Sequence, residues 1–309
     1  MKELENQIIG GENAVTRTGF IAIVGRPNVG KSTLLNAMLG EKVAIVSKKP
    51  QTTRTRITGI LTRGADQFVF LDTPGMHKPK TKLGQRMVHS ISSAIGDVDA
   101  AILVADASYA PGDIEISLIK RLESLELPVI LVLNKTDACS HEQIGQTIRA
   151  YAELYDYASV IPISALKNDG VEIVIDEASK LLLEGDWFFD SDELTDQPEK
   201  QIASEIIREK LLRLLDNEIP HGTAVVIEDF KEEKNLISIR AEIFCERENH
   251  KGIIIGKRGE TLKKIASYAR EDMENFFASK VFLDIWVKVK ENWRDSDIII
   301  NNFGFKLDD

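Results

Sequence analysis

The sequence lacks long apolar runs and has only two cysteines. No apolar run approaches the roughly 20 residues that a membrane-spanning helix needs, and residues 1–19 contain no apolar stretch typical of a secretory signal. Cys139 and Cys245 lie far apart and outside any metal-ligand spacing, as expected of a protein in a reducing compartment. These absences predict a cytoplasmic protein.

Basic residues are fewer than acidic ones, 39 against 49, and the net charge is −10. On average such a balance argues against nucleic acid as a partner. One stretch departs from this average: HKGIIIGKRGETLKK, residues 250–264, has five basic residues and one acidic residue. With 309 residues, of which 43% are hydrophobic and 28% charged, the chain has the composition of a globular protein and the length of two domains.

Short apolar segments alternate with longer mixed segments in the first part of the chain. Segments that are apolar throughout are typical of strands buried on both faces of a mostly parallel sheet, and the alternation predicts a doubly wound mixed α/β domain. RITGILTRGADQFVFL predicts an antiparallel hairpin with its turn at residues 64–66. The expected strands are residues 20–25, 68–73, 100–106, 129–134 and 160–165.

The pattern changes after an acidic segment without periodicity, EGDWFFDSDELTDQPEK. The residues that follow it predict the order α-β-β-α-α-β, a second and smaller α+β domain. We therefore predict a leader at 1–17, a nucleotide-binding domain at 18–185, a linker at 186–200, a second domain at 201–292 and a C-terminal tail at 293–309.

GRPNVGKS, residues 25–32, fits the pattern G-x-x-x-x-G-K-[S/T] directly after an expected strand. Its glycines let the backbone wrap a phosphate, which then faces amide N–H groups and a helix N-terminus. Lys31 is expected to neutralise the β- and γ-phosphates, and the Ser32 hydroxyl to bind Mg²⁺. The predicted nucleotide-binding residues of this loop are Gly25, Arg26, Pro27, Asn28, Val29, Gly30, Lys31, Ser32 and Thr33.

Three further motifs follow in order at the ends of later strands. In DTPG, Asp72 is expected to hold Mg²⁺ and the Gly75 amide to contact the γ-phosphate. In NKTD, the carboxylate of Asp137 can accept two hydrogen bonds from guanine, which adenine cannot donate. The sequence thus predicts GTP or GDP as the ligand, with Mg²⁺. The residues predicted to contact it are Asp72, Thr73, Pro74, Gly75, Asn134, Lys135, Asp137, Ser164, Ala165 and Leu166.

Residues 46–56, VSKKPQTTRTR, are polar and lack periodicity. A GTPase needs a threonine here to sense the γ-phosphate through Mg²⁺; we choose Thr53, with Thr52 as the alternative. The predicted metal ligands are then Ser32, Thr53 and Asp72, and the predicted catalytic residues are Lys31, Thr53 and Gly75.

Met76 stands where many such enzymes have a glutamine that positions the attacking water. A thioether cannot orient water through a hydrogen bond, so we expect slow intrinsic hydrolysis. A general-base role can be imagined for the adjacent His77, but a polar loop residue is the simpler interpretation.

The basic stretch contains G-x-x-G between two helical segments. In such a loop the glycines let a nucleic-acid backbone approach while basic side chains meet its phosphates, and the neighbouring groove holds about four unpaired bases. The alternative is a solvated helix–turn–helix corner. Trp286 and Trp293 could stack on bases, although core packing is the safer interpretation. The predicted RNA-binding residues are Lys251, Gly252, Ile255, Gly256, Lys257, Arg258, Gly259 and Lys263.

The motifs GRPNVGKST, QTTR, DTPGMH and NKTD, followed by ASEIIREKLL, EIPH and IIIGKRGETLKKI, closely resemble the Era family of GTPases over residues 18–306. The resemblance implies a TrmE-Era-like GTPase domain followed by a type II KH domain. It further implies binding to the 3′ end of 16S ribosomal RNA in the GTP state and a role in small (30S) subunit assembly and 16S rRNA processing. Peripheral membrane association is also attributed to the family, whose members resemble this chain in having a hydrophobic residue at the position of Met76.

Three other functions can be compared with this one. A GTP-dependent RNA-modification enzyme would need a catalytic cysteine or a cofactor site, and neither is evident. An assembly GTPase with two GTPase domains would need a second phosphate-binding loop. An RNA-binding module with a vestigial GTPase remains as the alternative, although Lys31, Ser32, Asp72 and Asp137 are intact. Nothing in the sequence demands an oligomer, so we expect a monomer.

Overall fold

The computed structural model describes residues 15–47 and 49–305, and it divides into two compact units. The first unit contains the chain up to Ala44, Arg56–Met76 and Ile91–Asp196. The second contains Ile45–Thr55, His77–Ser90 and the chain from Gln197 onward. Residues 1–14 of the predicted leader and 306–309 of the predicted tail lie outside the described residues.

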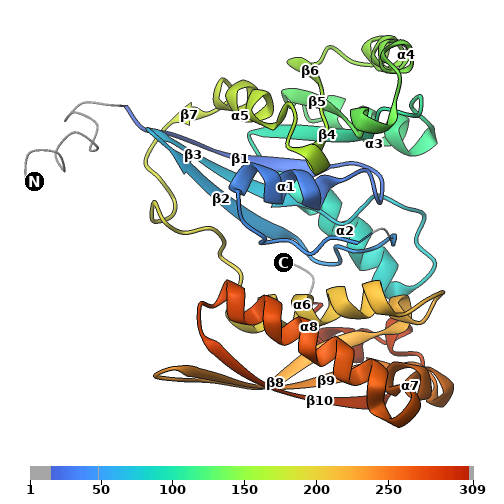
Figure 1. Cartoon of the computed structure of the whole chain (residues 1–309). Helices are drawn as coiled ribbons and strands as arrows, with labels where there is room; N and C mark the ends of the chain where they lie inside the picture. Colours follow the sequence, from blue (N-terminus) through green and yellow to red (C-terminus); the bar gives the residue numbers. More distant parts are fainter. Residues whose placement is uncertain (1–14, 48, 306–309) are drawn as a thin grey trace, which may run out of the picture. The chain divides into compact units, whose positions relative to one another are not determined.

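A mixed sheet forms the centre of the first unit (Figure 1). The strand order is β2-β3-β1-β4-β5-β6, and β7 pairs with β1. Strands β1, β3, β4, β5 and β6 are parallel, whereas β2 and β7 run antiparallel to their neighbours. The strands are β1 (Arg17–Val24), β2 (Ile57–Arg63), β3 (Asp66–Asp72), β4 (Ala100–Asp106), β5 (Val129–Asn134), β6 (Ser159–Pro162) and β7 (Leu183–Glu184).

Helices cover both faces of this sheet, because alternate strand residues point to opposite faces. Ile21 and Ile23 of β1 pack in one cluster with α1 (Lys31–Leu39) and α5 (Val171–Ser179). Ala22 and Val24 pack in the other cluster, with α3 and α4 and the last residues of α2. These helices span Lys82–Gly96 (α2), Asp113–Glu123 (α3) and His141–Ala152 (α4). The predicted doubly wound fold and its antiparallel edge hairpin are confirmed.

The predicted linker is not a plain spacer over its first part. The indole Nε1 of Trp187 donates to the carbonyl of Ala65 at 3.1 Å, and the Thr195 hydroxyl donates to the carbonyl of Thr58 at 2.7 Å. The segment from Trp187 to Thr195 therefore packs along the β2–β3 hairpin and belongs to the first unit. Hydrogen bonds to carbonyls of the hairpin order a segment that shows no periodicity of its own.

The second unit has the predicted order α-β-β-α-α-β. Strand β9 lies between β8, which is antiparallel to it, and β10, which is parallel. The inward-facing residues of the sheet pack on the helices around a separate apolar core. The elements are α6 (Glu199–Leu214), β8 (Ala224–Glu233), β9 (Leu236–Cys245), α7 (Glu248–Ile255), α8 (Glu260–Phe276) and β10 (Lys280–Val289).

After β10 the chain forms a short helix, α9 (Asp297–Asn302). Trp293 is fully buried in a small cluster with Ile300 and Phe305, so its interpretation as a core residue is confirmed. Trp286, on β10, is 60% exposed, so the interpretation as a core residue is wrong for Trp286. Its side chain lies on the face of the sheet that is not covered by helices. No helix in the described part of the chain is long and apolar enough to cross a bilayer.

Candidate functional site

The phosphate-binding motif lies between β1 and α1, as its pattern predicts. Lys31 begins α1 with only 6% of its surface exposed. Its Nζ donates to the carbonyls of Gly25 at 3.2 Å and Arg26 at 3.0 Å. Burial lowers the pKa of Lys31 to about 8, against the opposing effect of the Asp72 carboxylate. The ammonium is therefore held over its own loop, where a bound phosphate could replace those carbonyls as its partner.

Two of the three predicted metal ligands lie side by side. Asp72 ends β3 and is fully buried, and the hydroxyl of Ser32 donates to its Oδ2 at 2.6 Å. A hydroxyl and a carboxylate are hard oxygen ligands of the kind that Mg²⁺ prefers. The donor set therefore fits a magnesium ion.

The DTPG motif packs directly against the phosphate-binding loop. A Cβ atom on Gly75 would lie 2.6 Å from the Cα of Pro27, so only glycine permits this approach. The amide of Met76 donates to the carbonyl of Gly25 at 3.1 Å, and its side chain packs against the core on the second face of the sheet. Met76 thus anchors the motif through its backbone, while its side chain offers no group that could orient water.

Asn134 joins three of the predicted motifs. It is 3% exposed; its Nδ2 donates to the carbonyl of Val29 at 2.8 Å, and its Oδ1 accepts from the amide of Ala165 at 2.9 Å. A single buried amide group therefore fixes the NKTD loop against the phosphate-binding loop and the SAL segment. This network brings the predicted phosphate and base contacts to one rim of the sheet.

The predicted base-selecting carboxylate is held in place by the SAL segment. The hydroxyl of Ser164 donates to Asp137 Oδ1 at 2.6 Å. Ala165 is buried, but Leu166 is 80% exposed. The structure thus places Ser164 and Ala165 in contact with the neighbouring motifs and leaves the Leu166 side chain largely in solvent.

Two carboxylates that sequence analysis missed lie at the same rim. Asp106, at the end of β4, accepts from Lys135 Nζ at 2.7 Å. Burial acts to raise the pKa of Asp106, but hydrogen bonds from Lys135 and Ser108 outweigh it and hold the pKa below its usual range. Glu115 pairs with Arg26 at 3.2 Å. The position of Asp106 at a strand end could have been read as a signal, whereas Glu115 lies in a helix with no motif to mark it.

A cavity of about 300 Å³ is lined by residues of the phosphate-binding loop. Arg26 and Glu115 line it, as do Asp106 and Lys135. Two ion pairs, Arg26–Glu115 and Lys135–Asp106, therefore lie in the wall of a cavity next to the predicted nucleotide position.

Thr53, the third predicted metal ligand, belongs to the second unit and is 5% exposed. The hydroxyl of its neighbour Thr52 donates to the carbonyl of Lys49 at 2.7 Å. His77 also belongs to the second unit.

The G-x-x-G loop connects α7 and α8. Gly256 and Gly259 have φ values of 73° and 80°, which glycine adopts without strain. Lys257 and Arg258 between them are exposed, and no described carboxylate forms an ion pair with either. Their charges are therefore available to phosphates, as the RNA-binding prediction requires.

The apolar run before this loop is only partly a packing element. Ile254 is fully buried, whereas Ile253 is 49% exposed. Lys251 and Gly252 lie on α7 and Lys263 on α8, so the predicted RNA-binding residues come from both helices and the loop. Ile253 differs from Ile254 because a helix directs successive side chains to different faces.

Comparison with known proteins agrees with this two-part organisation. Residues 20–135 match the family model described as 50S ribosome-binding GTPase, and residues 218–294 match the KH domain model. GTPase Era from Ruminiclostridium cellulolyticum is 50% identical over 291 residues, which cover 94% of this chain and 98% of the relative. The chain belongs to the Era family of GTPases. GTPase Era from Clostridium kluyveri is likewise 50% identical over 94% of the chain and 99% of the relative.

Solved structures of the family share the fold. A single-residue variant of Aquifex aeolicus Era bound to GDP·AlF4⁻ superimposes with a TM-score of 0.91 at 37% identity, over 94% of this chain and all of that one. Era in complex with MgGDPNP and nucleotides 1506–1542 of 16S ribosomal RNA gives a TM-score of 0.89, also at 37% identity, over the same shares. This chain is therefore a GTP-hydrolysing protein with an RNA-binding KH domain.

Proposed function

We propose that this GTPase acts in assembly of the small ribosomal subunit, where its KH domain binds the 3′ end of 16S rRNA. The observation that carries the proposal is the exposed Lys257–Arg258 pair of the G-x-x-G loop, which has no ion-pair partner among the described residues. The same chain carries the motifs predicted to bind a guanine nucleotide. The solved family member bound to nucleotides 1506–1542 of 16S rRNA supports this choice of RNA.

The net charge of the chain supports selective binding of RNA. From Gln201 onward there are 18 basic and 21 acidic residues, a net charge of −3. Attraction of phosphates is thus confined to the loop and its two helices, and the remaining acidic surface disfavours non-specific contacts. A loop that places glycine backbone beside two cations suits single-stranded RNA, whose bases can enter the adjoining groove.

We further propose that Mg²⁺ accompanies the nucleotide and supplies charge neutralisation at the phosphates. Ser32 and Asp72 would hold it, with Thr53 joining them in the GTP state. Lys31 balances the negative charge of the β- and γ-phosphates, the Gly75 amide meets the γ-phosphate, and Asp137 selects guanine. Because Met76 cannot position the attacking water, we expect slow intrinsic turnover.

In this proposal the nucleotide state controls RNA binding. The GTP state orders residues 46–56 and the segment from Asp72 to His77, and this changes how the KH domain meets RNA. Hydrolysis then releases the RNA. We place the protein in the cytoplasm as a monomer, with peripheral attachment to the membrane surface as a further property to be tested.

Titration of the full chain with a labelled single-stranded RNA from the 3′ end of 16S rRNA tests the RNA-binding part of the proposal. The double variant Lys257→Gln/Arg258→Gln should lower the slope of log affinity against log salt by about 1.4, since each phosphate contact on a single strand contributes about 0.7. The matched control is Lys234→Gln/Arg240→Gln, two exposed cations of the same domain outside the loop. Equal slopes for both double variants would refute the assignment of the loop.

A further inference from the structure

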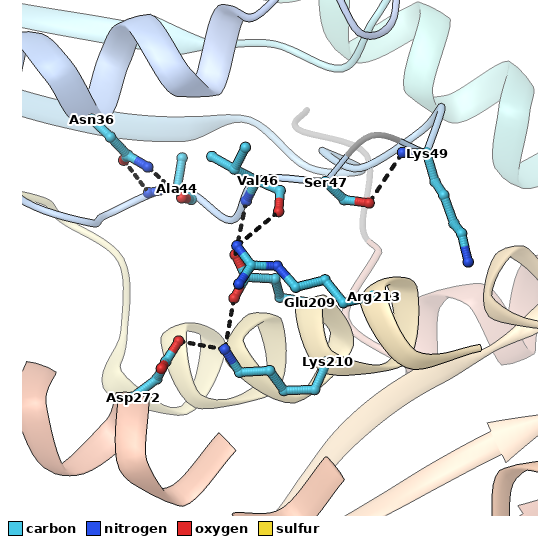
Figure 2. Close-up of polar contacts among 9 residues, drawn as sticks. All are labelled: Asn36, Ala44, Val46, Ser47, Lys49, Glu209, Lys210, Arg213 and Asp272. Carbon is cyan, nitrogen blue, oxygen red and sulfur yellow. Dashed lines mark hydrogen bonds and ion pairs between the residues drawn. The ribbon is translucent and has the colours of Figure 1, made fainter. Parts of the chain in front are cut away.

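The described residues 45–47 and 49–55, which include Thr53, are held by side chains of α6. The amide of Val46 donates to Glu209 Oε1 at 3.1 Å, and Arg213 donates to the carbonyl of Val46 at 3.3 Å (Figure 2). Both hydrogen bonds are made to the backbone of Val46, so they position the segment independently of its side chains. A segment with the sequence of a polar loop is thus attached to the second unit.

The carboxylate that receives Val46 is part of a buried charge network. Glu209 is fully buried and also accepts from Lys210 at 2.9 Å and from Arg213 at 2.9 Å. Lys210 extends the network to Asp272 of α8 (Figure 2). Buried charges are costly unless each is paired. The network therefore fixes the side chain of Glu209 on α6 and joins α6 to α8.

Stronger contacts surround Thr53 itself. Arg208 of α6 donates to the carbonyl of Thr52. On the other side, the guanidinium of Arg54 donates to the carbonyls of Thr223 at 2.6 Å and His221 at 2.8 Å. Both neighbours of Thr53 are therefore held by the second unit.

Trp293 supports the Arg54 contact. The guanidinium carbon of Arg54 lies 5.9 Å from the centre of the Trp293 ring, within the range of a cation–π interaction. The indole Nε1 donates to the carbonyl of Gly222 at 2.9 Å, which fixes the ring beside the carbonyls that Arg54 binds.

The same tryptophan packs with the segment that follows DTPG. Leu83 and Met87 of α2 lie in its cluster, and Arg86 of α2 bonds to Asp297 of α9 at 3.0 Å. Trp293 is thus the point at which two segments meet, one containing Thr53 and one continuing from the γ-phosphate motif.

Arg54 is only 3% exposed, so its docking buries a charged group. Backbone carbonyls replace the water that would otherwise solvate the guanidinium. Because burial of a charge is costly, a competing interaction can replace this docking.

We propose that Arg54 and Trp293 are positioning residues for Thr53. They hold Thr53 on the second unit, and this docking competes with binding of Thr53 to Mg²⁺. The balance between the two states then sets the preference of the protein for GTP over GDP. This inference rests on the role of Thr53 in the proposed function. Since coupling between two sites is reciprocal, the KH unit then influences the nucleotide site without any RNA present.

The test compares the dissociation constants of a fluorescent GTP analogue and of the matching GDP for the full chain with saturating Mg²⁺ and no RNA. Arg54→Lys keeps the charge but removes the planar guanidinium, whose two NH2 groups each bind one carbonyl, and Trp293→Phe removes the indole N–H. Both variants should shift the ratio of the two constants towards GTP by about fivefold, a coupling of about 1 kcal/mol. Their thermal unfolding midpoints show whether the fold is retained, and either variant alone suffices for the test.

Two further arms separate docking from general destabilisation. In a Thr53→Ala background the shift should vanish, because docking acts through Thr53. The matched control Lys180→Gln, which removes a surface ion pair with Glu177 of α5, should leave the ratio unchanged. A ratio within twofold of wild type, a shift towards GDP, or a shift that persists in Thr53→Ala would overturn the inference. Because no RNA is used, this result is independent of whether the protein binds 16S rRNA.

Discussion

At the scale of single residues, the predicted nucleotide site is built from polar groups that already have partners inside the protein. Lys31 binds carbonyls of its own loop, Ser32 binds Asp72, and Ser164 binds Asp137. These contacts hold the side chains near their expected positions before a ligand arrives, and a bound phosphate would then replace the carbonyls that Lys31 binds. The roles of Lys31 and Asp137 can each be tested by a separate measurement.

Lys31 should take up a proton when nucleotide binds. Burial lowers its pKa to about 8 in the free protein, and the negative phosphates of a bound nucleotide favour the charged form. At pH 8 about half a proton should therefore be bound per nucleotide, and affinity should fall about fourfold between pH 7 and pH 8.5. Isothermal titration in two buffers of different ionisation enthalpy measures the proton count; a count of zero at pH 8 would contradict this prediction.

Asp137 should decide which base is bound. Replacing its carboxylate in Asp137→Asn removes one acceptor for guanine and supplies an N–H donor that suits xanthine, which has a carbonyl at the same place. We expect roughly hundredfold weaker GTP binding and a gain for XTP. Competition between the two nucleotides for the labelled site measures the switch. Unchanged discrimination against XTP would remove Asp137 from the base site.

At the scale of elements, the strand ends and the G-x-x-G turn explain why so much could be predicted. Strands buried on both faces are apolar throughout, and the loops after β1, β3 and β5 carry local motifs, so their position at one rim follows from parallel strand order. Partners distant in sequence gave no such signal. Glu115 meets Arg26, and Phe305 meets Trp293, only through tertiary packing.

At the turn between α7 and α8, a negative side chain should weaken RNA binding more than a neutral side chain of the same size. Gly259 has a φ of 80°, and a Cβ there meets nothing within 4 Å among the described residues. Asn and Asp both tolerate this conformation, so Gly259→Asn is a matched control for Gly259→Asp. We expect about tenfold weaker RNA binding for Asp than for Asn, because only Asp repels phosphates. Equal affinities of the two variants at low salt would argue against phosphate contact at this turn.

At the scale of the whole molecule, the sequence predicts both domains but not how the polar segment 46–56 is used. Its side chains show no period that indicates packing, and its contacts with α6 are made largely by its backbone. Pattern analysis reads side chains and therefore misses such docking. The partners, Arg208 and Glu209, stand in the sequence as ordinary charged residues of a helix, yet both are buried.

The coupling of nucleotide state to RNA binding is the central claim of this account. It is tested most directly by titrating the wild-type full chain with labelled RNA from the 3′ end of 16S rRNA, once with a non-hydrolysable GTP analogue and once with GDP, at the same salt and Mg²⁺ concentrations. We predict at least fivefold tighter binding with the analogue, the lower end of usual allosteric coupling. Equal affinity in the two nucleotide states would be compatible with a GTPase domain and an RNA-binding domain in one chain, but it would contradict the proposed coupling between them.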